Sequence, residues 1–178
     1  MQLRTLLVSL FMTSAAAFAA SPIAARPAPP LDIVDSAGKH FVLSSYRGKV
    51  VVVQFLLTTC SHCQAFSKLL DRLQAEYGPK GFQAVGAAVN EATNEMARDY
   101  HANIAPAFPI AAVPHDLFLS FMGVSVMARP GFPQIAVTDR QGQIREQSSS
   151  DMNAAQPLQD EAHLRALIEK LLAEGASR

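Results

Sequence analysis

The stretch VVVVQFLLTTCSHCQAF, residues 50–66, contains both cysteines of the chain, Cys60 and Cys63. Its first eight residues are almost continuously apolar and mostly β-branched, which is typical of a strand buried on both faces. From Ser61 onward the apolar residues follow a helical spacing, at Phe66, Leu69, Leu70, Leu73 and Tyr77. The sequence therefore predicts a buried strand, then the cysteine pair, then a helix.

The two cysteines are placed for redox chemistry. Cys60 falls where the predicted strand gives way to the helix, and the free N–H groups and positive dipole end of a helix favour a thiolate there. Cys63 lies one turn further along, close enough to form a short disulfide with Cys60. In such a pair Cys60 would attack a partner's disulfide, and Cys63 would then resolve the mixed disulfide.

Two other uses of the pair stay open. A purely structural disulfide across so short a loop removes little chain entropy, so its stabilising value is small. A closed zinc site needs four ligands, but the histidines outside the motif stand singly, at His40, His101, His115 and His163. A soft copper(I) site on the two sulfurs would not need those histidines.

The rest of the chain alternates strands and helices. Short alternating runs at 31–35 and 40–43 predict a β-hairpin. Further strands are predicted at 81–90, 134–139 and 143–147, helices at about 93–102, 115–122 and 164–172, and an irregular segment at 106–114. This order, closed by an antiparallel strand pair, predicts an α/β fold with a mixed central sheet.

The composition agrees with one globular domain. The 178 residues are 49% hydrophobic and 17% charged, which provides enough apolar surface for a core and argues against disorder. Lysine plus arginine and aspartate plus glutamate both number 15, so the net charge is zero. No basic tract is present, and a nucleic-acid partner is therefore not expected.

The N-terminus has the order of a secretory signal. A lone Arg4 precedes an apolar run and small residues that end in Ala17-Phe18-Ala19, an A-x-A cleavage site. The apolar run is short for a membrane span, and an uncleaved anchor helix is the alternative. We expect a signal peptide at 1–19, a linker at 20–30 and one folded domain at 31–178. The mature chain would then lie outside the cytoplasm, where disulfides persist.

A second feature precedes the predicted strand at 134–139. Gly131-Phe132-Pro133 places a proline in a turn at the start of a strand, which makes the bond before Pro133 a candidate cis peptide. An X-Pro bond is trans by default, so the proline alone is a weak signal. Together with an upstream C-x-x-C at a strand–helix junction it is a much stronger one.

Residues 31–172 resemble the thioredoxin-like fold, and more narrowly the extracytoplasmic TlpA/ResA branch related to the AhpC/TSA group. The resemblance rests on YRGKVVVVQF before the C-x-x-C, FPI at 108–110, GFP at 131–133 and VTDRQGQI at 137–144. It implies a mixed central β-sheet flanked by helices, with an N-terminal β-hairpin and an inserted strand–helix (βα) unit.

The same resemblance implies roles for single residues. Cys60 would be the attacking thiol and Cys63 the resolving one. Pro133 would be a cis-proline that faces the disulfide, and the backbone of Phe132 would pair with an incoming peptide. Glu91 matches a glutamate that follows the inserted strand, and we expect it half-buried beside the pair, relaying a proton to or from Cys63. Its alternative role is a solvated residue near the start of the next helix.

The chain departs from the family pattern at several positions. Thr59 stands where the family usually has a tryptophan, which leaves the flat aromatic docking surface without its central residue. Gln54 stands where the family often has a buried polar or acidic residue, and an amide takes up no proton at neutral pH. Ser61-His62 replaces the common proline-containing pair and resembles DsbA, a strong oxidant. His62 would stabilise the Cys60 thiolate and so the reduced form, or it is simply an exposed residue at the helix start.

These observations predict an extracytoplasmic, bacterial periplasmic thiol–disulfide oxidoreductase. Its partners would be protein thiols or disulfides and a membrane electron donor or acceptor. It would need no metal and no organic cofactor besides the redox-active Cys60–Cys63 disulfide. The direction stays open, since ResA-like relatives reduce their clients whereas the Ser-His dipeptide favours an oxidant. The alternatives are a copper(I) carrier of the Sco type and, less favoured because Leu57 replaces the threonine of peroxiredoxins, a thiol peroxidase.

Overall fold

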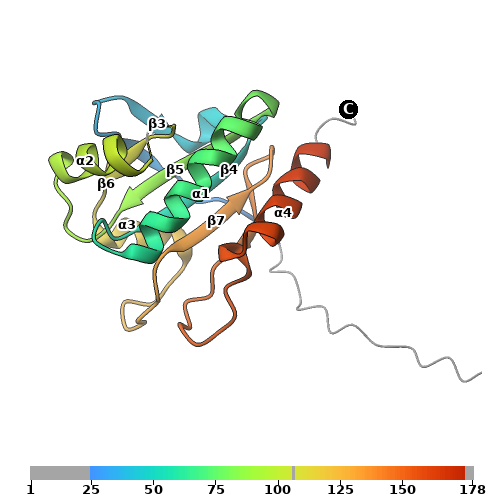
Figure 1. Cartoon of the computed structure of the whole chain (residues 1–178). Helices are drawn as coiled ribbons and strands as arrows, with labels where there is room; N and C mark the ends of the chain where they lie inside the picture. The colour runs from blue at the N-terminus through green and yellow to red at the C-terminus, as the bar shows by residue number, and fades with distance from the viewer. Residues whose placement is uncertain (1–24, 106, 175–178) are drawn as a thin grey trace, which may run out of the picture.

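The computed structural model describes residues 25–105 and 107–174, which form a mixed α/β fold around one central sheet (Figure 1). The six strands lie in the order β1 (Arg26–Pro27), β8 (Gln143–Gln147), β7 (Gln134–Thr138), β4 (Val50–Leu56), β5 (Phe82–Ala88) and β6 (Ile110–Ala112). β4, β5 and β6 run parallel to one another, whereas β7 is antiparallel to β4 and to β8. A separate antiparallel hairpin consists of β2 (Asp32–Val34) and β3 (His40–Val42).

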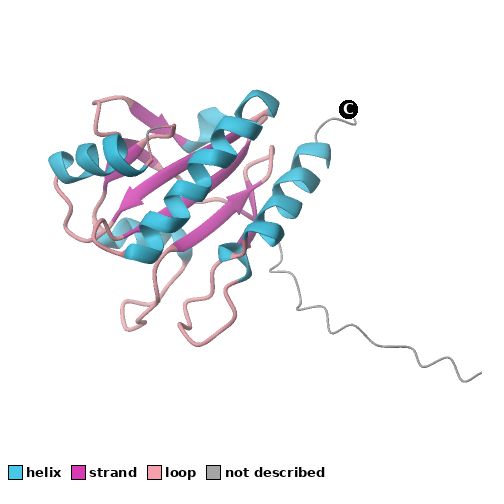
Figure 2. Cartoon of the chain, in the orientation of Figure 1, coloured by secondary structure: helices cyan, strands magenta, loops and turns pink. Residues whose placement is uncertain are grey.

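Within the described residues, four α-helices and three short 3-10 helices complete the fold. Figure 2 distinguishes helices, strands and loops by colour. The α-helices are α1 (Ser61–Tyr77), α2 (Asn94–Ile104), α3 (His115–Met122) and α4 (Glu161–Glu174). The 3-10 helices are η1 (Leu43–Tyr46), η2 (Gly78–Lys80) and η3 (Pro157–Gln159). The predicted mixed sheet flanked by helices is confirmed, together with the N-terminal hairpin.

The central strand β4 divides the core into two layers. Every residue of β4 is buried, because helices or the hairpin cover both faces of the sheet, and this explains the continuous apolar run. Val50, Val52 and Leu56 pack with α1, α2 and α4 on one face. Val51, Val53 and Phe55 pack with α3 and the hairpin on the other. Gln54 has the parity of the first set, so its side chain points towards α1.

Strand β6 lies in a segment for which the sequence predicted no regular structure. It has only three residues, at the sheet edge, and it lies between Pro109 and Pro114. Prolines are tolerated there because an edge strand leaves one row of backbone groups unpaired. The carbonyl of Pro109 still accepts a hydrogen bond from the amide of Gly86 on β5. The expectation of an irregular segment at 106–114 is therefore wrong for residues 110–112.

The sheet also begins earlier in the chain than the predicted domain boundary at residue 31. The predicted linker is extended where the structure describes it, but its Arg26 and Pro27 pair with Ile144 and Gln143 of β8. The predicted signal peptide at 1–19 lies outside the described residues. Within the described part of the chain, no helix is long and apolar enough to cross a membrane.

The elements that carry the candidate site converge on one edge of the molecule. α1 begins there, and the loop of residues 123–133 between α3 and β7 projects from the same edge, beside the loop of residues 148–156 between β8 and η3 (Figure 1). The two loops are in contact, because a Cβ atom on Gly131 would lie 3.7 Å from Cβ of Met152.

Candidate active site

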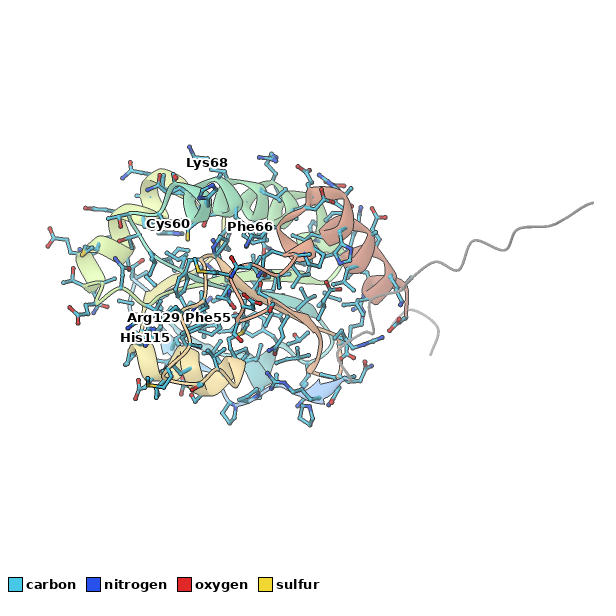
Figure 3. All side chains as sticks on the ribbon, turned by 90° about the horizontal axis from the view of Figure 1, so that it is seen from below. Phe55, Cys60, Phe66, Lys68, His115 and Arg129 are labelled. Atoms are coloured by element: carbon cyan, nitrogen blue, oxygen red, sulfur yellow. The ribbon has the colours of Figure 1, made fainter. Side chains whose placement is uncertain are left out.

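The cysteine pair lies at the N-terminus of α1, as the sequence predicts. Cys60 is the N-cap residue, in extended backbone geometry, and its Sγ accepts a hydrogen bond from the amide of Cys63 at 3.3 Å. This bond satisfies one of the N–H groups that a helix start leaves without a partner. Figure 3 shows Cys60 at the end of α1, and both cysteines are free thiols.

The two thiols differ sharply in their access to solvent. Cys60 is partly exposed, whereas Cys63 is 0% exposed and belongs to the core under α1. Burial, and next the hydrogen bond with Cys60, raise the pKa of the Cys63 thiol to about 12. A sulfur atom of another molecule can therefore reach Cys60, while Cys63 is accessible only to Cys60 itself.

Two amide side chains fix the loop that precedes Cys60. Asn90, which follows β5, accepts a hydrogen bond from the amide of Thr58 at 3.2 Å and donates one to its hydroxyl at 3.0 Å. Gln64 on the first turn of α1 donates a hydrogen bond to the carbonyl of Thr58 at 3.0 Å. The segment between β4 and α1 is thus hydrogen-bonded to the loop after β5 and to α1, and these bonds set the position of Cys60.

Residues 131–133, here called the proline segment, lie next to Cys60. The bond between Phe132 and Pro133 is cis, and the Phe132 carbonyl lies 3.9 Å from Cys60 Sγ. The ring of Phe132 packs on Phe118 of α3, with centroids 5.4 Å apart. Its side chain is therefore anchored in the fold, and its backbone lies beside the reactive sulfur.

Glutamine side chains hold this proline segment in place. Gln134 is fully buried, and its Nε2 donates to the carbonyls of Gly131 at 2.7 Å and Ser149 at 3.2 Å, which ties together the two loops at the site edge. Gln159 of η3 donates to the carbonyl of Pro133 at 3.3 Å. Neither residue was predicted to belong to the site, although Gln134 directly follows Pro133 and is a polar residue in a buried strand.

The remaining predicted site residues take different positions. Thr59, Ser61 and His62 are all exposed around the start of α1. Glu91 is exposed too, with a left-handed φ of 54°, so the expectation that it lies half-buried beside the pair is wrong. The side chain that contacts the cysteine loop is that of the preceding residue, Asn90.

The surroundings of the pair contain few groups that could join it as metal ligands. Among residues 25–105 and 107–174, no three side chains of His, Cys, Asp or Glu come together as a metal-binding group. Apolar side chains are instead exposed near the site. Val126, Met127 and Met152 lie on the two loops at the site edge, and they are 79%, 83% and 62% exposed.

Comparison with known proteins agrees with this geometry. Among solved structures, a protein assigned as thiol:disulfide interchange protein DsbE from Chlorobium tepidum is 25% identical, with a TM-score of 0.68 over 83% of this chain and 96% of that chain. A thiol:disulfide interchange protein of the thioredoxin family from Chlorobium tepidum TLS is 24% identical, with a TM-score of 0.67 over 84% and 98%. A thiol:disulfide interchange protein from Bacteroides sp. is 20% identical, with a TM-score of 0.65 over 84% and 90%.

The curated relatives match a shorter part of the chain. "Probable glutathione peroxidase 8-A" and "8-B" from Xenopus laevis are each 32% identical over 60 residues, which is 34% of this chain and 29% of each relative. The match therefore spans less than a third of these proteins.

The model of the Redoxin family matches residues 22–168, from before β1 into α4. This span contains the cysteine pair, the proline segment and all six strands of the central sheet. The predicted thioredoxin-like superfamily is thereby confirmed, and the chain belongs to the Redoxin family.

Proposed function

We propose that this protein exchanges thiols and disulfides with client proteins through the Cys60-Ser61-His62-Cys63 motif. One observation carries the proposal. Cys60 is an accessible sulfur at a helix N-terminus, and Cys63, within hydrogen-bond distance of it, is closed off from any other partner. This arrangement separates a nucleophile from a resolving thiol, as exchange through a mixed disulfide requires.

In the reductive direction the reaction has two steps. The Cys60 thiolate attacks one sulfur of a client disulfide, forms a mixed disulfide with it and releases the other client sulfur as a thiolate. Cys63 then attacks Cys60 Sγ, the Cys60–client bond breaks, and the client leaves as a dithiol. The client disulfide has then gained two electrons, and the Cys60 and Cys63 thiols have been oxidised to a Cys60–Cys63 disulfide. The reverse sequence of steps oxidises a client dithiol.

The surface around Cys60 suits a polypeptide client. Exposed apolar side chains, those of Val126, Met127 and Met152, lie on the two loops that project from the edge where α1 begins, and methionines adapt to varied apolar partners. A groove of about 340 Å³ begins at His62 and has Phe66 and Leu69 among its lining residues. The solved thiol:disulfide interchange proteins support protein thiols and disulfides as partners.

The wider setting follows from the N-terminal sequence and from the chemistry of the pair. We propose a location outside the cytoplasm, in the bacterial periplasm, where a membrane protein would restore the redox state of the pair. The residues that we assign to the exchange are Cys60, Cys63, Phe132 and Pro133, and no organic cofactor is required. Glu91 is left out of this set, because it is exposed.

The test is mixed-disulfide trapping with single-cysteine variants of the whole chain. A peptide disulfide is added to reduced Cys63→Ser and, separately, to reduced Cys60→Ser, and the products are measured by intact mass. We expect Cys63→Ser to accumulate a stable adduct and Cys60→Ser to remain unmodified. Equal labelling of both variants, or of neither, would refute the assigned roles. Copper(I) binding by a protein that does not exchange would favour the metal-carrier alternative.

A thiol peroxidase is the second candidate, because the curated relatives are glutathione peroxidases. In that reaction the Cys60 thiolate would reduce a peroxide to an alcohol or water, becoming a sulfenic acid that Cys63 converts to the disulfide. Peroxide consumption by wild type and Cys60→Ser, with dithiothreitol as the reductant, distinguishes the two. We expect exchange with peptide disulfides to exceed peroxide turnover.

A further inference from the structure

A groove of about 340 Å³ runs along one side of α1 and begins two residues from Cys60. The α1 residues that line it recur at helical spacing, which places them on a single face of the helix. They are His62, Ala65, Phe66, Leu69 and Arg72. Gln159 of η3 and Glu161 of α4 line the groove from its other side. We call it the α1 groove.

The α1 groove has the length and the floor of a site for an extended polypeptide. Phe66 and Leu69 are 5% and 7% exposed, so the core holds both side chains in place while a small apolar surface of each faces the groove. From residue 62 to residue 72 the helix covers about 15 Å, which is the length of about five residues of extended chain. Leu69 lies about 10 Å along it, or about three residues.

The far end of the α1 groove favours a carboxylate of the client. Arg72 is 60% exposed, and its Nη2 lies 3.2 Å from Oε2 of Glu161. That carboxylate also accepts a hydrogen bond from Nε of Arg165 at 3.0 Å, so it is shared between two cations. Lys68, one turn before Arg72, is exposed and has no ion-pair partner among the described residues. Asp160 accepts a hydrogen bond from an amide of α4 and caps that helix. Arg72 therefore has N–H donors left for a further carboxylate.

The α1 groove is continuous with the backbone beside the reactive sulfur. Gln159, which lines the groove, donates a hydrogen bond to the carbonyl of Pro133 at 3.3 Å. A side chain of the groove wall thus fixes the proline segment that lies next to Cys60. The groove also begins at His62, two residues from that cysteine. Residues that flank a client cysteine can therefore enter the groove from the reaction site.

We propose, building on the function above, that the α1 groove selects clients by the sequence beside their reactive cysteine. An aliphatic side chain about three residues from that cysteine lies over Phe66 and Leu69, and a carboxylate about five residues from it pairs with Arg72. The client is thus an extended polypeptide segment that is first apolar and then acidic. The groove takes no part in the transfer of electrons. It raises the rate at which such clients react by holding them against Cys60.

The experiment measures how fast symmetrical disulfides of six-residue peptides oxidise the reduced whole protein, by acid quenching and intact mass. One peptide has cysteine at its first position, leucine at its fourth and glutamate at its sixth, and a second has the reverse order. In the order that fits the groove, alanine in place of leucine should slow the reaction about fivefold or more, because an apolar contact is lost. Glutamine in place of glutamate should slow it about threefold at low ionic strength and have no effect in about 0.5 M salt.

Variants test whether these preferences come from the α1 groove. Ala65→Phe fills the groove from an exposed position and should remove the preference for leucine, whereas Ala75→Phe, exposed on another face of α1, should keep it. Arg72→Gln should remove the preference for glutamate. Arg98→Gln, which removes an exposed arginine of α2, is its matched control. Preferences that survive in Ala65→Phe and Arg72→Gln would overturn the proposal.

Two other outcomes would also overturn it. One is an equal rate for the leucine and alanine peptides in both orders. The other is a dimer in sedimentation that Ala65→Phe dissociates, because a second copy of the chain would then occupy the groove. Failure of the function proposed above looks different, since neither the peptides nor glutathione disulfide would then oxidise the protein at all.

Discussion

Gln54, Ser67 and Tyr100 form a buried hydrogen-bond chain, in which the Ser67 hydroxyl donates to Oε1 of Gln54 at 2.8 Å and its oxygen lies 2.8 Å from the hydroxyl of Tyr100. Ser67→Ala removes the middle hydroxyl and leaves two buried groups without partners, Oε1 of Gln54 and the hydroxyl of Tyr100. A buried unsatisfied polar group costs about 1–3 kcal/mol, so we expect a loss of about 3 kcal/mol. For a chain of this size that corresponds to a decrease in Tm of about 6–12 °C. Tyr100→Phe leaves the donor of Ser67 in use and should cost about 1 kcal/mol.

The double variant distinguishes this chain from ordinary packing. With Ser67→Ala and Tyr100→Phe together, only Oε1 of Gln54 remains unpaired, so the loss should be about 2 kcal/mol, roughly 2 kcal/mol below the sum of the single variants. Urea unfolding of the reduced proteins measures all three. Ser45→Ala, which removes an exposed hydroxyl bonded to the Val42 carbonyl, is the control and should change stability by about 0.5 kcal/mol or less. Additive losses, or less than about 1 kcal/mol for Ser67→Ala, would refute the reasoning.

Three other expectations follow from the site. Asn90→Ala releases the Thr58 loop and should slow the reaction of Cys60 with a peptide disulfide several-fold, whereas Glu91→Gln should leave the rate unchanged; the opposite order would restore Glu91 to the site. The reduced protein should lose stability as pH rises from about 9 towards 12, because the raised pKa of Cys63 keeps a proton on the folded state that the unfolded state has released. In urea unfolding at a series of pH values, the free energy of unfolding should fall less steeply with pH for Cys63→Ala than for wild type. An equal fall for both proteins would contradict this. His62→Ala should shift the reduction potential by about 20 mV or less, since an exposed charge contributes at most about 1 kcal/mol; a larger shift in glutathione equilibration would show that His62 controls the couple.

Much of the fold could be predicted because its signals are local. The continuous apolar run of β4 and the helical spacing of α1 each depend on neighbouring residues, and they place Cys60 at the junction without further information. The strand β6 could not be predicted in this way, because its three residues are a strand only by pairing with β5. Its composition alone, between two prolines, indicates a loop.

The site was predictable only in part, for the same reason. The cysteine motif and Pro133 are recognisable in sequence, but the side chains that fix them come from distant positions. Asn90 is 32 residues from Thr58, and Tyr100 is 33 residues from Ser67. Their contacts depend on the order of strands in the sheet and on how α2 packs beside α1. The expectation for Glu91 was wrong by one residue. The side chain after β5 that contacts the site is the amide of Asn90, whereas the carboxylate of Glu91 is exposed.

The different surroundings of the two cysteines connect the chemistry to the fold. Cys60 sits where β4 gives way to α1, at the edge that also carries the proline segment, so a client meets a sulfur already flanked by peptide backbone. One helical turn on, Cys63 faces the layer between α1 and β4, where Gln54 and apolar side chains surround it. In the proposed exchange, electrons must therefore enter and leave through Cys60, and Cys63 acts only on the sulfur of Cys60.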